Sequence, residues 1–162
     1  MKSIVLVRHG KSSWEFDVSD RQRPLKQRGM NDAQLVANEF IKSNAIPRYI
    51  FSSPANRALS TCKIFVKIFN LSESSISIAD DLYDFGGESV IHFIKTLPNS
   101  YESIMIFGHN HAFTSIANIF GDKFVGNLPT SGLIKLKFDI ENWQNLKQGT
   151  TELIIIPKEL KQ

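Results

Sequence analysis

The sequence predicts an α/β fold, a three-layer α/β/α sandwich built on a mainly parallel sheet with an antiparallel edge. Short apolar runs rich in β-branched and aromatic residues alternate along the chain with segments whose apolar residues recur at helical spacing. Such alternation indicates parallel strands joined by helices that cover both faces of the sheet. No helical pattern separates the last two strand-like runs, so we expect these two to pair antiparallel.

The expected strands have β-branched or aromatic cores, and turn residues bound most of them. They lie near residues 3–7, 48–51, 75–79, 103–107, 133–138 and 152–156.

Four helical patterns lie between these strands. Over residues 28–43, apolar side chains recur on one helix face. A second helix is expected to begin with Ser53 as its N-cap and Pro54 at its first position, because these residue types favour those places, and to continue through residue 69. Weaker patterns cover residues 88–97 and 112–120.

The composition is that of an ordinary globular protein, with 42% hydrophobic and 22% charged residues. A chain of 162 residues can bury a substantial core, and we expect residues 1–162 to form a single domain. The net charge of +3 is mild, and the lysines and arginines are spread along the chain. This pattern argues against a nucleic-acid partner and favours an anionic substrate.

The chain has one cysteine, Cys62, which excludes an internal disulfide and favours a reducing compartment. Cys62 lies on the apolar face of its expected helix, which predicts a buried thiol. No run approaches the ~20 apolar residues of a membrane span, and the run at residues 4–7 is too short for a signal-peptide core. We therefore expect a cytoplasmic protein that does not bind a membrane.

Polar side chains follow three of the expected parallel strands. Arg8 and His9 end the first strand, Arg57 stands in the first turn of the helix after the second, and His109 follows the strand at residues 103–107. The carboxyl ends of parallel strands meet at one edge of a sheet, where ligands usually bind. Two arginines and two histidines at that edge predict a pocket for an anion.

A phosphoryl group fits this set of side chains. Guanidinium groups bind phosphate oxygens in pairs, so we expect Arg8 and Arg57 to hold the group, assisted by a helix N-terminus. A neutral imidazole can attack phosphorus and form a phosphohistidine intermediate. The arginines favour a neutral His9, so His9 is the expected nucleophile and His109 the second imidazole on the phosphoryl oxygens.

Simpler interpretations of the same residues stay open. A histidine after a strand can be purely structural, and Arg57 can be an ordinary residue of a helix surface. His109 and His111 could also ligate a metal ion, but no cysteine or acidic residue stands at a ligand spacing. We therefore expect neither a metal nor another cofactor.

The chain resembles the histidine phosphatase superfamily, also called phosphoglycerate mutase-like. That family carries Arg-His-Gly after its first strand, then Ser-Pro-x-x-Arg-Ala-x-x-Thr and a later Gly-His, which stand here at residues 8–10, 53–61 and 108–109. The small SixA-type phosphohistidine phosphatase branch is similar also at residues 7–14, 23–29 and 128–132. The resemblance runs from residue 3 to about residue 138.

This resemblance implies metal-independent hydrolysis of a phosphomonoester or phosphoramidate. His9 would be transiently phosphorylated, while Arg8, Arg57 and His109 bind the phosphate. The implied partner is a phosphohistidine carrier protein or a small phosphate ester.

The proton donor is where the chain departs from the family pattern. Many members place Glu or Asp after the third strand, and in the matching stretch at residues 78–84 the nearest candidate is Asp80. Alternatively, Asp80 and Asp81 only form a solvated turn. A leaving alkoxide needs a proton more than a leaving imidazole does, so a weak acid would favour phosphohistidine as substrate.

The short connection after Asp81 also favours phosphohistidine on a protein as the substrate. The segment between Asp81 and residue 103 is short and reads largely as one helix, which leaves little chain for a lid over a small molecule. We predict a phosphatase acting on protein phosphohistidine in signal transduction. The alternatives are a general small-molecule phosphomonoesterase and a catalytically inert phosphate-binding docking module. A mutase is disfavoured because it must retain its substrate.

The surroundings of the first motif leave two questions open. Trp14, Phe16 and Phe85 could line the site or belong to the core. Arg21, Arg23 and Lys26 could steer an acidic partner, but we expect them to be solvated.

Overall fold

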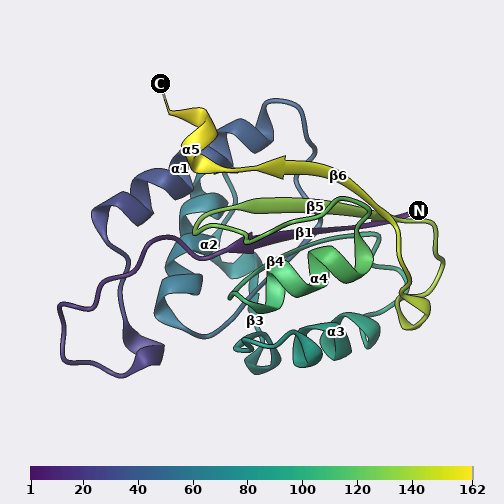
Figure 1. The fold of residues 1–162 in the computed structure, drawn as a ribbon, viewed down its shortest axis with the longest axis horizontal. Helices are drawn as coiled ribbons and strands as arrows, with labels where there is room; N and C mark the ends of the chain where they lie inside the picture. Colours follow the sequence, from purple (N-terminus) through teal and green to yellow (C-terminus); the bar gives the residue numbers. More distant parts are fainter. Residues whose placement is uncertain (162) are drawn as a thin grey trace.

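The computed structural model describes residues 1–161 and is built on a six-stranded sheet (Figure 1). In spatial order the strands are β3 (Ile76–Ile78), β2 (Tyr49–Ser52), β4 (Ser103–Gly108), β1 (Lys2–Arg8), β5 (Leu133–Phe138) and β6 (Thr150–Ile155). The first four of these are parallel neighbours, β5 is antiparallel to β1, and β6 is antiparallel to β5. The expected mainly parallel sheet with an antiparallel edge is confirmed.

Helices cover both faces of the sheet and complete three layers (Figure 1). The hydrophobic cluster on one face includes side chains of α1 (Gln27–Ile41), α2 (Asn56–Ile68) and α5 (Pro157–Leu160). The cluster on the other face includes side chains of α3 (Glu88–Lys95) and α4 (Ala112–Phe120). None of the helices within residues 1–161 has the length and apolar character that crossing a membrane requires.

Strand β1 lies inside the sheet between β4 and β5, and both of its faces are buried. Ile4 and Leu6 pack into the cluster beneath α3 and α4, whereas Val5 and Val7 pack beneath α1 and α2. A strand with two covered faces needs apolar residues at successive positions, which explains the uninterrupted apolar run. This packing fixes where the strand ends and therefore where Arg8 and His9 stand.

Helix α2 begins later than the sequence pattern suggests. Asn56 is its first residue and Ala55 its N-cap, so the expected start at Ser53 and Pro54 is wrong. The hydroxyl of Ser53 instead accepts a hydrogen bond from the backbone N–H of Ala55 at 3.1 Å and shapes the turn into the helix. Arg57 still falls in the first turn, and Cys62 is buried as expected.

Four short 3-10 helices lie in the connections between the main elements. They are η1 (Asp20–Gln22), η2 (Glu73–Ser75), η3 (Asp80–Leu82) and η4 (Trp143–Asn145).

The connection from β1 to α1 forms a long loop beside the carboxyl end of the sheet (Figure 1). Its two ends meet in an antiparallel bridge between Ser12 and Leu25, supported by a hydrogen bond from the Ser13 N–H to the Pro24 carbonyl at 2.8 Å. Residues 14–22 between these ends are exposed. The loop includes η1 and carries polar side chains to the end of β1.

The first turn of α1 packs directly on the backbone that follows His9. A Cβ atom on Gly29 would overlap the carbonyl oxygen of Lys11 and lie 2.8 Å from its amide nitrogen. Backbone atoms cannot rotate away as a side chain can. We predict that Gly29→Ala lowers the free energy of unfolding by about 1–3 kcal/mol, measured by urea denaturation.

The matched control for this substitution is Gly86→Ala, where the nearest atom to an added Cβ, Oδ1 of Asp84, lies 3.9 Å away. Equal stabilities of the two variants would contradict the close packing of α1 on this turn.

Candidate active site

The carboxyl ends of β1, β2 and β4 meet at a cleft of about 370 Å³. Arg8 and His9 line it from the end of β1, and Arg57 lines it from α2. His109, which follows β4, packs beside His9, and the centroids of the two rings lie 5.4 Å apart. The structure thus brings together four of the five expected site residues.

Hydrogen bonds orient the His9 ring. The backbone N–H of His9 donates to the Gly108 carbonyl at 3.0 Å, which continues the pairing of β1 with β4. Its Nδ1 lies 2.7 Å from the carbonyl oxygen of Gly10. A carbonyl oxygen only accepts, so Nδ1 carries the proton of the neutral ring and Nε2 keeps its lone pair.

His9 is neutral at pH 7. Burial and, to a smaller extent, the positive charges of Arg57, Arg8 and Arg23 together lower the pKa of His9 to about 4, against the opposing effect of the Gly10 hydrogen bond. His9 is only 7% exposed to solvent. A neutral imidazole with a free Nε2 is the state that attack on phosphorus requires.

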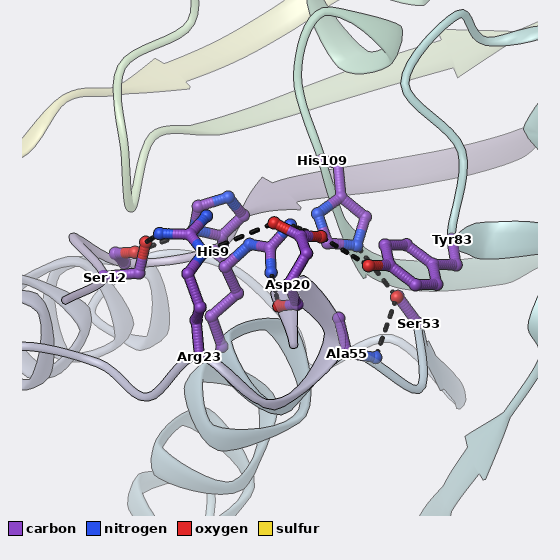
Figure 2. A network of polar contacts seen from close by, with 10 residues as sticks. His9, Ser12, Asp20, Arg23, Ser53, Ala55, Tyr83 and His109 are labelled. Carbon is purple, nitrogen blue, oxygen red and sulfur yellow. Dashed lines mark hydrogen bonds and ion pairs between the residues drawn. The ribbon is translucent and has the colours of Figure 1, made fainter. Parts of the chain in front are cut away.

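His109 is fully buried, and Ser53 holds it in place. Its Nε2 lies 2.8 Å from the Ser53 hydroxyl, whereas its Nδ1 has no hydrogen-bond partner (Figure 2). Burial, followed by the charges of His9 and Arg57, lowers the pKa of His109 to about 3. The Ser53 hydroxyl oxygen already accepts from Ala55, so its own proton is free for Nε2, which leaves the ring proton on Nδ1.

Each of the two arginines has a buried side-chain nitrogen without a hydrogen-bond partner. Arg57 is 2% exposed and donates through Nη1 to the backbone oxygen of Asp20 at 2.6 Å and through Nη2 to its carboxylate at 3.0 Å. Arg8 donates through Nη1 to the Leu128 carbonyl at 2.7 Å. The Nε atoms of both arginines are buried without a partner. Unpaired buried donors cost about 1–3 kcal/mol each, so their presence in one cleft indicates a site for an anion.

Two segments that the sequence motifs include fix this arrangement. Thr61 on α2 accepts the backbone N–H of Gly10 at 2.9 Å and so ties the helix to the turn after His9. The backbone N–H of Ser131 lies 3.1 Å from the Arg8 carbonyl oxygen and 3.0 Å from that of His9. These bonds give Thr61 and the segment at residues 128–132 a positioning role that the sequence alone did not assign.

Asp20 is a site residue that the sequence analysis missed. Its carboxylate accepts hydrogen bonds from the hydroxyl of Tyr83, from Arg57 and from Arg23 (Figure 2). Burial by itself would raise the pKa of Asp20, but these hydrogen bonds and the Arg57 charge outweigh it and bring the pKa to about 2. The residue lies in a loop without periodicity, so no sequence pattern marked it.

The expectation that Arg23 is solvated is wrong. Arg23 is 7% exposed and donates to Ser12 Oγ at 2.8 Å, while its guanidinium lies 3.6 Å from the centre of the Trp14 ring. A loop that folds back on the site buries it. Arg21 and Lys26 are exposed, as expected.

Asp80 does not join the other expected site residues. It stands exposed at the start of η3, outside the residues that line the cleft. The structure therefore gives its role as a proton donor no support and agrees with the solvated-turn alternative. Asp84 also turns away, because its Oδ2 accepts the N–H groups of Gly87, Ser89 and Val90 at the start of α3.

The aromatic residues near the first motif differ in whether they line the cleft. Trp14 and Phe85 line the cleft and are exposed at its rim, at 76% and 49%. Phe16 is exposed in the same loop but does not line the cleft. As for metal ligands, residues 1–161 contain no group of three or more His, Cys, Asp or Glu side chains that could hold an ion.

Comparison with known proteins assigns the family. The model of the histidine phosphatase superfamily (branch 1) matches residues 4–90, more than half of the chain, so the chain belongs to this superfamily. Its fold is that of SixA. The structure of the protein histidine phosphatase SixA complexed with tungstate superimposes with a TM-score of 0.83 at 22% identity, covering 98% of this chain and 99% of that one.

Other similar proteins agree on the fold. A SixA protein from Agrobacterium tumefaciens gives a TM-score of 0.79 at 23% identity over 96% of this chain and 99% of its own. A mycobacterial glucosyl-3-phosphoglycerate phosphatase gives 0.67 at 13% identity over 94% and 98%.

Two relatives without a characterised function match by sequence. A chloroplastic protein of Arabidopsis thaliana is 27% identical over 128 residues, which is 73% of this chain but only 58% of the plant protein. A Mycobacterium tuberculosis protein is 24% identical over 164 residues, 91% of this chain and 96% of its own.

The two neutral histidines make stability depend on pH. Between pH 6.5 and about 4 an unfolded histidine binds a proton that buried His9 does not. Falling pH therefore stabilises the unfolded state relative to the folded state. We predict that the free energy of unfolding decreases over this interval by about 3 kcal/mol for His9 alone.

Urea denaturation of the wild-type protein and of His9→Asn over the same pH range checks this prediction. The variant, which lacks the titrating ring, should show the shallower dependence. Parallel curves for the two proteins would show that His9 is not buried in its neutral form.

Proposed function

We propose that this protein is a metal-independent phosphatase that hydrolyses protein phosphohistidine through a phosphohistidine intermediate on His9. One observation carries the proposal: the Nδ1–H of His9 is held by the Gly10 carbonyl, which leaves Nε2 unprotonated in a site that also holds three unpaired buried nitrogens. These nitrogens are Nε of Arg8, Nε of Arg57 and Nδ1 of His109. The family supplies the reaction class, since its members are phosphatases.

The reaction follows from these positions. The three unpaired nitrogens donate to the phosphoryl oxygens and stabilise the charge that they carry during transfer. Nε2 of His9 attacks phosphorus while the leaving group takes the electron pair of its bond to phosphorus. Water then attacks the phosphorylated His9, releases inorganic phosphate and restores the free imidazole. The two arginines supply the positive charge that a metal ion supplies in other phosphatases.

The choice of phosphohistidine rests on proton supply and access. None of the carboxyl groups described above is positioned as an acid: Asp80 lies outside the cleft, and the pKa of Asp20 is about 2. An imidazole departs with less proton assistance than an alkoxide. Trp14 and Phe85 at the open rim offer apolar surface to a protein that carries the phosphoryl group. The similar SixA is described as a protein histidine phosphatase.

The proposal extends to the organisation of the chain. Strands from both ends of the sequence, β1 and β6, belong to one sheet, which supports a single histidine phosphatase domain over residues 1–162. Cytoplasmic signal transduction is the proposed setting, in agreement with the free buried thiol of Cys62.

A single-turnover assay tests the function. A phosphohistidine-bearing carrier protein, a phosphoserine peptide and an aryl phosphate are compared as substrates. We expect fast phosphate release from phosphohistidine, reduced at least about a thousandfold in His9→Ala because the nucleophile is lost. His92→Ala is the matched control, since His92 is exposed on α3.

The other outcomes are equally informative. Preference for the two esters would identify a general small-molecule phosphomonoesterase. Binding of phosphate without turnover of any substrate would identify an inert docking module.

Metal independence is a separate prediction. Because nitrogen donors of Arg8, Arg57 and His109 would carry the phosphoryl charge, dialysis against EDTA should leave the rate of phosphohistidine hydrolysis unchanged. A loss of activity that added Zn²⁺ or Mg²⁺ restores would refute it.

A further inference from the structure

We propose that Asp20 determines specificity by keeping a negative charge beside the leaving group, so that the site favours phosphoramidates over phosphate esters. This inference rests on the proposed phosphatase function. A carboxylate inside an anion site repels the phosphoryl group that the site attracts, and a site selected only for phosphate binding would avoid it. The position and bonding of Asp20 show how the two anions can coexist.

Asp20 and the phosphoryl group use different nitrogens. The backbone oxygen of Asp20 accepts a hydrogen bond from Nη1 of Arg57, and its carboxylate accepts one from Nη2. Nε of Arg57 has no partner. Nε of Arg8 and Nδ1 of His109 are free as well. A phosphoryl group on these three nitrogens therefore does not displace the carboxylate.

The carboxylate lies on the outer side of the site. The Asp20 side chain is 46% exposed, whereas that of Arg57 beneath it is 2% exposed and the His9 residue 7%. In Figure 2 the carboxylate lies between His9 on one side and Tyr83 and His109 on the other. Attack by the buried Nε2 of His9 pushes the leaving group away from His9, towards the open mouth. Asp20 borders that path.

Asp20 is held as an anion. The Tyr83 hydroxyl, Arg57 and Arg23 all donate to its two oxygens, so protonation would break favourable contacts. The pKa of Tyr83 is raised by burial and by its bond to Asp20, which keeps the phenol protonated and donating. An acid that stays ionised cannot supply a proton to a departing alkoxide, but it stabilises a neighbouring cation.

Phosphohistidine provides such a cation. When the ring nitrogen remote from phosphorus binds a proton from solvent, the ring becomes a phosphoimidazolium. His9 Nε2 then forms its bond to phosphorus, the bond between phosphorus and the ring nitrogen breaks, and the electron pair stays on that nitrogen. The leaving group departs as neutral imidazole. A carboxylate that accepts the remote N–H favours the protonated ring, whereas it repels the alkoxide formed from an ester.

The test compares leaving groups in Asp20→Asn, which keeps the shape and removes the charge. We expect kcat/KM for a phosphohistidine carrier protein to fall about ten- to a hundredfold, while kcat/KM for an aryl phosphate, whose anionic leaving group Asp20 repels, does not fall. Asp17→Asn is the matched control, because Asp17 is an exposed acid of the same loop. Asp20→Glu, which retains the charge, should recover part of the selectivity.

A pH profile separates this role from a structural one. Loss of the Asp20 charge lowers the pKa of the bound phosphoimidazolium, so the alkaline limb of the phosphohistidine profile should move to lower pH in Asp20→Asn. Thermal unfolding of each variant verifies that it is folded.

Two results overturn the inference alone: an equal loss on both substrates, which makes Asp20 only a support for Arg57, and no change on either. Failure of the wild-type protein to hydrolyse phosphohistidine instead overturns the proposed function, and the inference with it.

Discussion

The candidate site depends on the hydrogen bond between Nδ1 of His9 and the carbonyl oxygen of Gly10. This bond selects one tautomer of a buried, neutral ring and leaves Nε2 of this cleft-lining residue unprotonated. Its geometry needs the backbone after β1 to turn closely against α1 and α2. The packing of Gly29 on Lys11 and the bond from the Gly10 N–H to Thr61 hold that turn.

The sheet supplies the remaining geometry by its topology. Parallel pairing of β1 with β4, and of β4 with β2, brings residues separated by about fifty positions in sequence to one edge. This arrangement destabilises the fold at the site, because several buried donors lack partners and two histidines are kept neutral by burial. The apolar clusters on both faces of the sheet stabilise the fold enough to tolerate these groups.

The loop between β1 and α1 contributes further side chains to this site. It adds a carboxylate, a third arginine and an exposed tryptophan to a set of residues that otherwise only attracts anions. The sequence analysis considered a lid only between Asp81 and β4 and found little chain for one there. In the structure the exposed segment at residues 14–22 borders the site instead, and it brings Asp20 to Arg57.

The sequence by itself determined the fold class, the strands and the convergence of Arg8, His9, Arg57 and His109. Apolar runs buried on two faces are visible in the chain, and the edge where parallel strands end follows from topology. The N-terminus of α2, the burial of Arg23 and the position of Asp20 were decided only by the tertiary structure. The first two follow from how the turn before α2 and the loop after β1 fold, and the third depends on contacts between segments distant in sequence, the pairing of Asp20 with Arg57 and Tyr83, which no local pattern of residues encodes.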